Sequence, residues 1–214
     1  MVHLTDIVLA VTAYLLGSIP FGFLLVKFVR KEDIRQKGSG NIGATNVIRS
    51  GARGLGALTF VLDACKGVLA VLLCGWLGSH SSLRPVEHSH ALAMGALFAI
   101  LGHIYPVWLG LKGGKGVATA FGVFVALAPW PALCSLGIFI LLFAIFRYVS
   151  LGSIVATISF PVFAWILPHR PQGQLMWTVI CFLAVLVVYK HRENIVRLLR
   201  GTEYRFGKPR AEAA

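Results

Sequence analysis

Charged residues are scarce in this sequence, at 13% of its 214 residues, whereas soluble globular domains carry about 25%. Hydrophobic residues make up 57%. This composition excludes an ordinary soluble domain and predicts an integral membrane protein with several spans. Because spans of about 20 residues use nearly the whole length, we expect residues 1–214 to form one all-α membrane domain.

Several patterns typical of other protein classes are missing. The 4 cysteines form no CxxC pair and lie within apolar segments, so we expect small core side chains rather than disulfides or metal ligands. The G-x-x-x-x-G-K-[ST] spacing of nucleotide-binding loops is absent, which disfavours an ATPase. No internal repeat is visible, which weakens the case for an inverted-repeat transporter. We expect neither a metal nor a cofactor.

What is present is a series of seven apolar segments, each of which predicts a membrane-spanning helix. They cover about residues 5–28, 54–77, 90–110, 116–131, 132–147, 151–167 and 173–190. The fourth and fifth are short and meet at two prolines, Pro129 and Pro131, which break helix continuity. These two segments form either two full spans or a re-entrant element.

The first apolar segment carries helix-breaking and small residues. Close packing and a kink are predicted there by Gly17, Ser18, Pro20 and Gly22. Asp6 precedes the segment in place of a basic stretch. We therefore expect the segment to be retained rather than cleaved as a signal peptide.

The basic residues predict the orientation in the membrane. If the segments alternate, the loops on one side hold most of the 20 Lys and Arg residues, and those on the other side hold Arg84 and Arg170. The positive-inside rule then puts the N-terminus outside and the C-terminus in the cytoplasm. The net charge of +12 is thereby explained by orientation and lipid headgroups rather than by nucleic-acid binding.

Three polar segments fall on the predicted cytoplasmic side. The first, Gly38–Arg49, reads G-S-G-N-I-G-A-T-N-V-I-R. Its glycines free backbone N–H groups, its small polar side chains hydrogen-bond, and its arginine can bind two phosphate oxygens. A plain glycine-rich linker has no need of these side chains. The phosphate-binding candidates are Ser39, Asn41, Thr45, Asn46 and Arg49.

The second polar segment runs from Gly102 to Thr119, and its stretch Lys112–Gly116 opens the fourth apolar segment. Its glycines let the backbone approach an anion, and the following helix N-terminus attracts negative charge. The alternative is a flexible basic turn that serves topology alone. The candidates are Lys112, Gly113, Gly114, Lys115 and Gly116.

The third polar segment begins at the inner end of the last span, with H-R-E-N-I-V-R followed by Gly201 and Glu203. His191 and Asn194 share one face of a helix there. They either complete the cradle or cap the helix and contact lipid. A smaller polar stretch after Arg147 adds Ser150 and Ser153.

Two ionisable residues lie deep in the second span. Asp63 and Lys66 are three residues apart, and charges at that depth require a partner. We expect an internal structural pair, with support of the polar site as the alternative. His103 is either a base or an interhelical hydrogen-bonding residue.

These motifs resemble a known family. The sequences at 38–49, 102–119 and 191–197 are similar to the three cytoplasmic motifs of the bacterial acyl-phosphate-dependent glycerol-3-phosphate acyltransferases, the PlsY family. Matches at 14–20, 62–67 and 147–153 extend the likeness over nearly the whole chain. The family usually has Phe where Leu111 stands. Like the family, the chain lacks an H-x-x-x-x-D motif.

The resemblance implies a seven-helix enzyme of the bacterial cytoplasmic membrane with its active site on the cytoplasmic face. It would transfer a fatty acyl group from acyl phosphate to the sn-1 hydroxyl of glycerol 3-phosphate, the first step of phospholipid synthesis. The products would be lysophosphatidic acid and phosphate. Its partners would be these substrates, membrane lipid and an upstream enzyme that makes acyl phosphate.

Residue by residue, the resemblance implies that Ser39, Arg49 and a lysine bind one of the two phosphate-bearing substrates. We favour Lys115 over Lys112 because it faces the helix start. Ser150 or Ser153, His191 and Asn194 match the remaining polar wall.

No nucleophile triad is visible, so we expect catalysis by positioning and charge neutralisation. The donor phosphate would accept the hydroxyl proton, and Ser39 and His191 would hold the alcohol. The alternatives are a transporter or flippase for a phosphorylated metabolite or lipid, and a structural scaffold. A transporter requires polar access from both sides, whereas the predicted outer loops are short and carry no matching polar residues.

Overall fold

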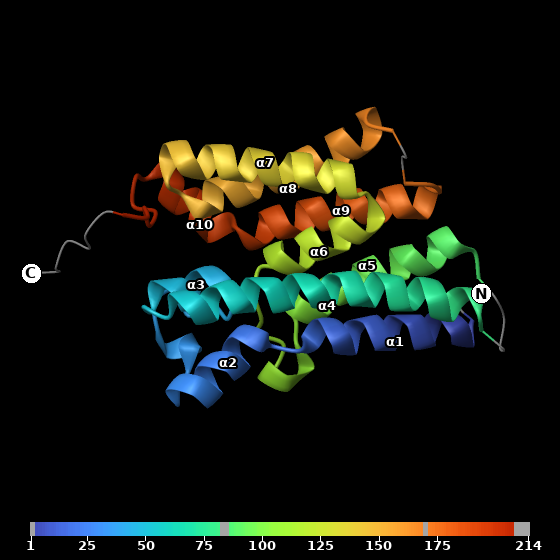
Figure 1. Cartoon of the computed structure of the whole chain (residues 1–214), viewed down its shortest axis with the longest axis horizontal. Coiled ribbons are helices and arrows are strands. Elements are labelled where there is room, and N and C mark those ends of the chain that lie inside the picture. Colours follow the sequence, from blue (N-terminus) through green and yellow to red (C-terminus); the bar gives the residue numbers. More distant parts are fainter. Residues whose placement is uncertain (1–2, 82–85, 169–170, 208–214) are drawn as a thin grey trace, which may run out of the picture.

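The computed structural model describes residues 3–81, 86–168 and 171–207, and all regular structure in these ranges is helical. Most helices run along the long axis of the molecule, with α1 starting at one end and α10 lying at the other (Figure 1). The elements are α1 Leu4–Ser18, α2 Phe21–Arg30, η1 Ile34–Gln36, α3 Ala44–Arg49, α4 Arg53–Ser79, α5 His88–Ile104, η2 Val107–Leu109, α6 Val117–Leu127, α7 Pro129–Phe146, α8 Val149–Ile166, α9 Gln174–Lys190 and α10 Arg192–Leu199.

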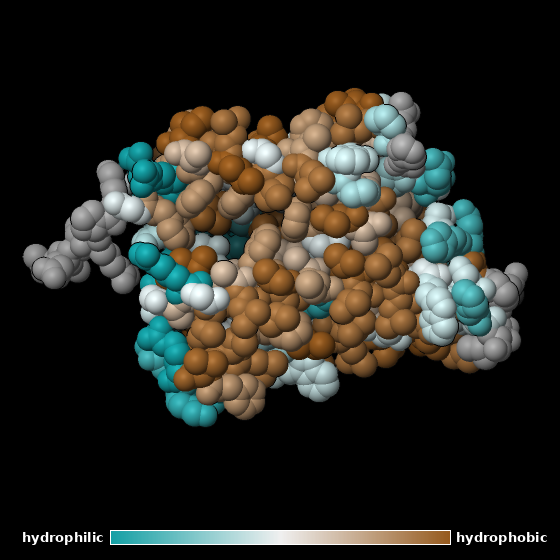
Figure 2. Space-filling model, viewed as in Figure 1, coloured by the Kyte–Doolittle hydropathy of each residue, from teal (hydrophilic) through white to brown (hydrophobic). Residues whose placement is uncertain are grey.

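The outer surface is that of a multi-pass membrane protein. Figure 2 shows a broad apolar band flanked by polar residues at both ends. Within the described residues, five helical stretches are long and apolar enough to span a bilayer, and α9 with α10, bent by 54°, is a sixth candidate. Arg84, Arg170, Lys208 and Arg210, which entered the prediction of orientation, lie outside the described residues.

All seven predicted apolar segments are helical, but the fourth and fifth differ from each other. The fourth, α6, has 11 residues, whereas the fifth, α7, has 18 and is long enough to span a bilayer. The expectation that both are short is therefore wrong for α7. The reason is that Pro129 and Pro131 lie in the first turn of α7, where a missing N–H costs nothing, so they start this helix instead of shortening it.

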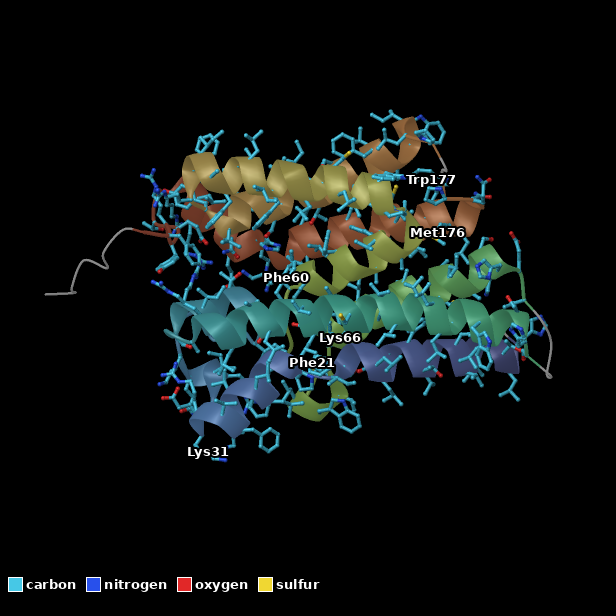
Figure 3. All side chains as sticks on the ribbon, in the orientation of Figure 1. Phe21, Lys31, Phe60, Lys66, Met176 and Trp177 are labelled. Atoms are coloured by element: carbon cyan, nitrogen blue, oxygen red, sulfur yellow. The ribbon has the colours of Figure 1, made fainter. Side chains whose placement is uncertain are left out.

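The predicted break in the first span is present. α1 ends at Ser18 and α2 begins after Pro20, and a side chain at Gly17 or Gly22 would collide with the backbone of α5 or of the α3 loop. The carbonyl of Ile19 at the break accepts a hydrogen bond from Lys66 Nζ, 2.7 Å away. Figure 3 shows Lys66 on α4 reaching toward the break beside Phe21.

Helix α6 lies beside the middle of α4 and reaches neither end of the bundle (Figure 1). Two glycines allow this close contact, because a Cβ on Gly67 would collide with the Thr119 carbonyl and one on Gly122 with the Ala64 carbonyl. The end of the loop that precedes α6, residues 113–116, therefore lies within the bundle rather than at its surface.

The cysteines are free, as expected, but not all are core residues. Cys74 is buried, whereas Cys65, Cys134 and Cys181 are exposed. In a bilayer an exposed apolar side chain contacts lipid rather than water. An apolar segment therefore does not reveal which of its faces is buried.

Candidate active site

One cavity of about 200 Å³ lies between α3 and α4 on one side and α7 and α8 on the other, with α6 behind it. Figure 2 shows a hollow in this position with polar atoms at its bottom. The cavity is lined by most of the predicted site residues, namely Ser39, Asn41, Thr45, Asn46, Arg49, Lys115, Gly116, Ser150, Ser153, His191 and Asn194. Segments up to about 150 residues apart in the chain therefore meet at one place.

Three predicted residues of the second polar segment do not line the cavity: Lys112, Gly113 and Gly114. Lys112 is exposed. The Gly113 and Gly114 amides donate to the carbonyls of Ile104 and His103, each at 3.1 Å, so they are not available to a phosphate. A side chain on Gly114 would collide with the His103 imidazole. These two glycines therefore serve packing against α5.

The first polar segment is held together by Asn46, which is 2% exposed. Its Nδ2 donates to the carbonyls of Lys37 and Asn41, at 3.0 and 2.7 Å, and its Oδ1 accepts from the Ser39 amide at 2.8 Å. Asn41 Oδ1 in turn accepts from the Gly43 amide at 2.9 Å. Both asparagines thus shape the loop, and Ser39 and Thr45 are left as its small side chains on the cavity.

Arg49 projects from the end of α3 with its side chain 14% exposed. Its guanidinium carbon lies 4.2 Å from the centre of the Tyr204 ring, and its Nη2 is 3.7 Å from Glu203 Oε1. Its Nε is buried without a hydrogen-bond partner among the described residues. Burial lowers the pKa of Arg49, an effect that Glu203 opposes. The guanidinium therefore faces the cavity with hydrogen-bond donors to spare.

Glu203 connects the polar residues around the cavity. Its Oε1 accepts from Ser150 Oγ at 3.0 Å and from Asn194 Nδ2 at 2.8 Å, and its Oε2 accepts from Arg197 Nε at 2.7 Å. Burial by itself raises the pKa of this carboxyl, but the three hydrogen bonds outweigh burial and lower the pKa. Glu203 is thus an ionised counterion to the surrounding cations.

Glu203 and Tyr204 had no role in the sequence-based assignment. The signal for Glu203 is weak but present, because it is one of two acids in the strongly basic stretch Lys190–Arg210. No pattern in the sequence identifies Tyr204 as a neighbour of Arg49.

Lys115 precedes α6 and donates a hydrogen bond to Asn194 Oδ1. Burial lowers its pKa to about 8, with Arg197 and Arg49 adding to the effect and Glu203 opposing it. Lys115 is therefore still largely protonated at neutral pH and supplies a cation to the cavity. This agrees with the preference for Lys115 over Lys112.

His191, between α9 and α10, is a neutral hydrogen-bond acceptor. Burial lowers its pKa to about 4, and the charge of Lys115 acts in the same direction. Its Nδ1 lies 2.7 Å from the Val187 carbonyl, and because a carbonyl can only accept, Nδ1 carries the proton. Nε2 is then left to accept a hydrogen bond from a hydroxyl group.

The expected pair in the second span is an ion pair below this polar region. Lys66 Nζ lies 2.7 Å from Asp63 Oδ1, and both side chains are at most 3% exposed. His103 Nδ1 lies 3.6 Å from the same oxygen, and Asp63 and His103 line the cavity. Since Lys66 also holds the Ile19 carbonyl, the pair serves the fold and borders the site at once.

The other end of the cavity is apolar. It is lined by Phe60 from α4, Phe121 and Phe124 from α6, and Leu136 and Phe139 from α7. Phe60 is labelled in Figure 3 on the side of α4 that faces the cavity. One continuous cavity therefore joins a cationic, hydrogen-bonding end to an aromatic end.

Comparisons with known proteins agree with this description. The sequence model of the family described as glycerol-3-phosphate acyltransferase matches residues 7–201. A glycerol-3-phosphate acyltransferase of Trichlorobacter lovleyi is 50% identical over 194 residues, which cover 91% of this chain and 94% of the relative. One of Synechococcus elongatus is 42% identical over 205 residues, or 96% of each chain.

Two crystal structures described as PlsY (YgiH), an integral membrane glycerol 3-phosphate acyltransferase, have a similar fold. Its glycerol 3-phosphate form has a TM-score of 0.83 and 42% identity, covering 94% of this chain and 96% of that one. Its lysophosphatidic acid form has a TM-score of 0.80 and 41% identity, covering 94% and 95%.

The fold and the cavity define a helical, multi-pass membrane protein with one polar and one apolar half to its site. Within that class, the chain belongs to the glycerol-3-phosphate acyltransferase family. The resemblance inferred from the sequence motifs is confirmed.

Proposed function

We propose that this protein transfers a fatty acyl group from acyl phosphate to the sn-1 hydroxyl of glycerol 3-phosphate, and that it releases lysophosphatidic acid and phosphate. The observation that carries the proposal is the two-ended cavity, since a reaction between a polar phosphate ester and a lipid donor needs both environments side by side. The similar structures are described as a glycerol 3-phosphate form and a lysophosphatidic acid form, which correspond to the proposed acceptor and product.

The polar end fits two phosphate groups. Arg49 and Lys115 supply the cations, with Ser39, Ser150 and Asn194 as hydrogen-bonding walls. Arginine binds phosphate oxygens in pairs, and lysine acts as a compact charge. The aromatic end takes the acyl chain, which enters from the bilayer between α4 and α7.

The reaction needs little beyond positioning. The hydroxyl oxygen of glycerol 3-phosphate attacks the acyl carbonyl carbon and forms the ester bond, while the bond from that carbon to the phosphate oxygen breaks. The phosphate leaves with the electron pair and takes up the hydroxyl proton. His191 Nε2 and Ser39 hold the hydroxyl in line, and Arg49 and Lys115 stabilise the charge that gathers on the leaving phosphate.

The proposed setting is a bacterial cytoplasmic membrane. The seven apolar segments are embedded in it, with the 11-residue α6 held inside the bundle. The N-terminus lies outside, the C-terminus lies inside, and the cavity opens on the cytoplasmic face. The 20 Lys and Arg residues and their unequal distribution over the loops support this orientation. A cytoplasmic opening suits glycerol 3-phosphate, and an upstream enzyme that makes acyl phosphate supplies the donor.

The test is a phosphate-release assay on the purified full chain in lipid mesophase. Glycerol 3-phosphate and acyl phosphates of several chain lengths should give phosphate and lysophosphatidic acid in equal amounts, whereas acyl-CoA should give no product. Failure with every acyl phosphate, together with turnover of acyl-CoA, would show that the donor is wrong.

Two substitutions test the assignment of roles. Arg49→Ala should lower kcat/KM by about 100-fold or more, because a charged phosphate ligand is lost from a buried site. His191→Ala should lower it less, since a neutral histidine only orients the alcohol. If Arg49→Ala kept near-normal kcat/KM for glycerol 3-phosphate, the cationic end would not be the phosphate site.

A further inference from the structure

The residues after α10 run across one end of the bundle as a segment held at both ends, residues 201–207, which we term the C-terminal strap (Figure 1). At its start the Thr202 amide donates to the Arg197 carbonyl at 2.9 Å. At its end the Phe206 amide donates to the Arg147 carbonyl, between α7 and α8, at 3.0 Å. The family match ends at residue 201, so the strap beyond this residue lies outside the matched region.

Aromatic contacts fix one ring of the strap. Tyr204 meets Phe206 edge to face, with ring centres 5.0 Å apart and planes at 88°. Phe206 in turn meets Phe143 of α7 at 5.6 Å and 76°. Such contacts favour a defined ring orientation. Tyr204 is therefore held in place from α7, a helix distant in sequence from Arg49.

Arg49 lies over the face of the Tyr204 ring. The guanidinium carbon lies 4.2 Å from the ring centre, within the range of a cation–π contact. Stacking engages the face of the guanidinium plane, whereas phosphate oxygens bind the N–H groups at its edge. The contact with Tyr204 therefore leaves the phosphate-binding edge of Arg49 available.

Without this ring, Arg49 has a competing partner. Its Nη2 is 3.7 Å from Glu203 Oε1, beyond hydrogen-bond distance. The two groups already form an ion pair. A small rotation would turn it into a hydrogen-bonded pair and occupy the donors that a phosphate needs. A free arginine side chain also loses about 2 kcal/mol of rotamer entropy when it binds. Tyr204 opposes both effects by holding the side chain in one position.

We propose that Tyr204 is a positioning residue that holds Arg49 ready for the phosphate of glycerol 3-phosphate. This inference rests on the proposed function, in which Arg49 binds that phosphate. Loss of the ring face should weaken glycerol 3-phosphate binding about 3- to 30-fold, the range expected for a partly buried cation–π contact. The chemical step should be nearly unchanged.

The experiment measures the Kd of glycerol 3-phosphate by calorimetry on the full chain, and KM and kcat with acyl phosphate as donor. The variants are Tyr204→Ala, Tyr204→Leu and Tyr204→Phe. Tyr189→Ala is the matched control, since Tyr189 also contacts an arginine at 5.0 Å, but that arginine, Arg192, does not line the cavity as Arg49 does. The Ala and Leu variants should raise both Kd and KM, while kcat stays within about twofold of wild type. The Phe variant and the Tyr189 control should match wild type.

The outcomes separate this inference from the proposed function. Arg49→Ala is measured in parallel, and an unchanged Kd in that variant would overturn both. A raised Kd in Arg49→Ala with wild-type binding in the Ala and Leu variants of Tyr204 would overturn the role of Tyr204 alone. A Phe variant as weak as the Ala variant would overturn it as well, because the ring face would then be irrelevant. The Leu variant keeps apolar bulk in the strap if Ala unfolds it.

Discussion

Replacing Glu203 by Gln removes one negative charge from the centre of the polar cluster and keeps the shape of the side chain. The glutamine retains one carbonyl oxygen, so it can still accept from Ser150 or Asn194. It cannot accept from both of these and from Arg197 through two ionised oxygens, as Glu203 does. The variant therefore tests the effect of the negative charge while the packing of the side chain is kept.

The size of the effect follows from the three contacts. The bond from Asn194 is buried, and a hydrogen bond to a charged group contributes about 1.5–3 kcal/mol. Arg197 is 37% exposed, so its pairing adds about 0.5–1 kcal/mol. With one acceptor retained, we expect Glu203→Gln to lower the free energy of unfolding by about 2–4 kcal/mol, or Tm by about 4–16 °C for a chain of this size.

The assay is thermal unfolding of the purified protein in detergent, followed by tryptophan fluorescence, with Glu193→Gln as the control. Glu193 is the other acid of the same basic stretch, but it is exposed and should show almost no change. The Glu203 variant should also lose phosphate release at a lower pH than wild type, because Glu203 helps to keep Lys115 protonated. Equal Tm values for the two variants would refute the reasoning.

Three further predictions follow from other contacts. Because burial lowers the pKa of Lys115 to about 8, its charge is present below that pH and lost above it. In a pH–rate profile, kcat/KM should therefore fall as pH rises through 8. Lys115→Arg should remove this fall, because arginine stays charged. Lys66→Met should destabilise the protein by about 3–5 kcal/mol in thermal unfolding, because it leaves the buried Asp63 without its lysine and with only His103 nearby. The double variant with Asp63→Asn should recover most of the loss, and equal stability of the single and double variants would contradict the pairing. Gly114→Ala should cost about 1–3 kcal/mol because its Cβ meets an imidazole, whereas Gly137→Ala, in open space, should be neutral or slightly stabilising in the same measurement.

The helices and the membrane class were predictable because both follow from local hydropathy. The break at Pro20 was also predictable, since proline removes a backbone donor wherever it stands. The meeting of the three polar segments followed from alternating topology, which puts 38–49, 112–116 and 191–197 at one end of the bundle. These inferences need no knowledge of how side chains pack.

The contributions of individual residues within those segments were less predictable. Gly113 and Gly114 look like phosphate-binding glycines in sequence, but their amides bond to α5 because the recessed position of α6 brings the loop against His103. Glu203 and Tyr204 contact residues of the cavity lining because of the path of the strap, which depends on contacts with Arg147 and Phe143. Tertiary packing decided both outcomes, and a sequence pattern does not encode it.

The hydrogen bond from Lys66 to the Ile19 carbonyl has a consequence for how the chain enters the membrane. A carbonyl at a helix break is costly in hydrocarbon unless it is hydrogen-bonded. The Ile19 carbonyl accepts from the neighbouring Phe21 amide at 3.1 Å, and its second donor comes from α4, 47 residues further along the chain. Lys66 in turn brings its own counterion, Asp63, one helical turn before it. The broken first span and the charged second span therefore each satisfy a polar group of the other. We expect the two spans to leave the insertion machinery as a pair.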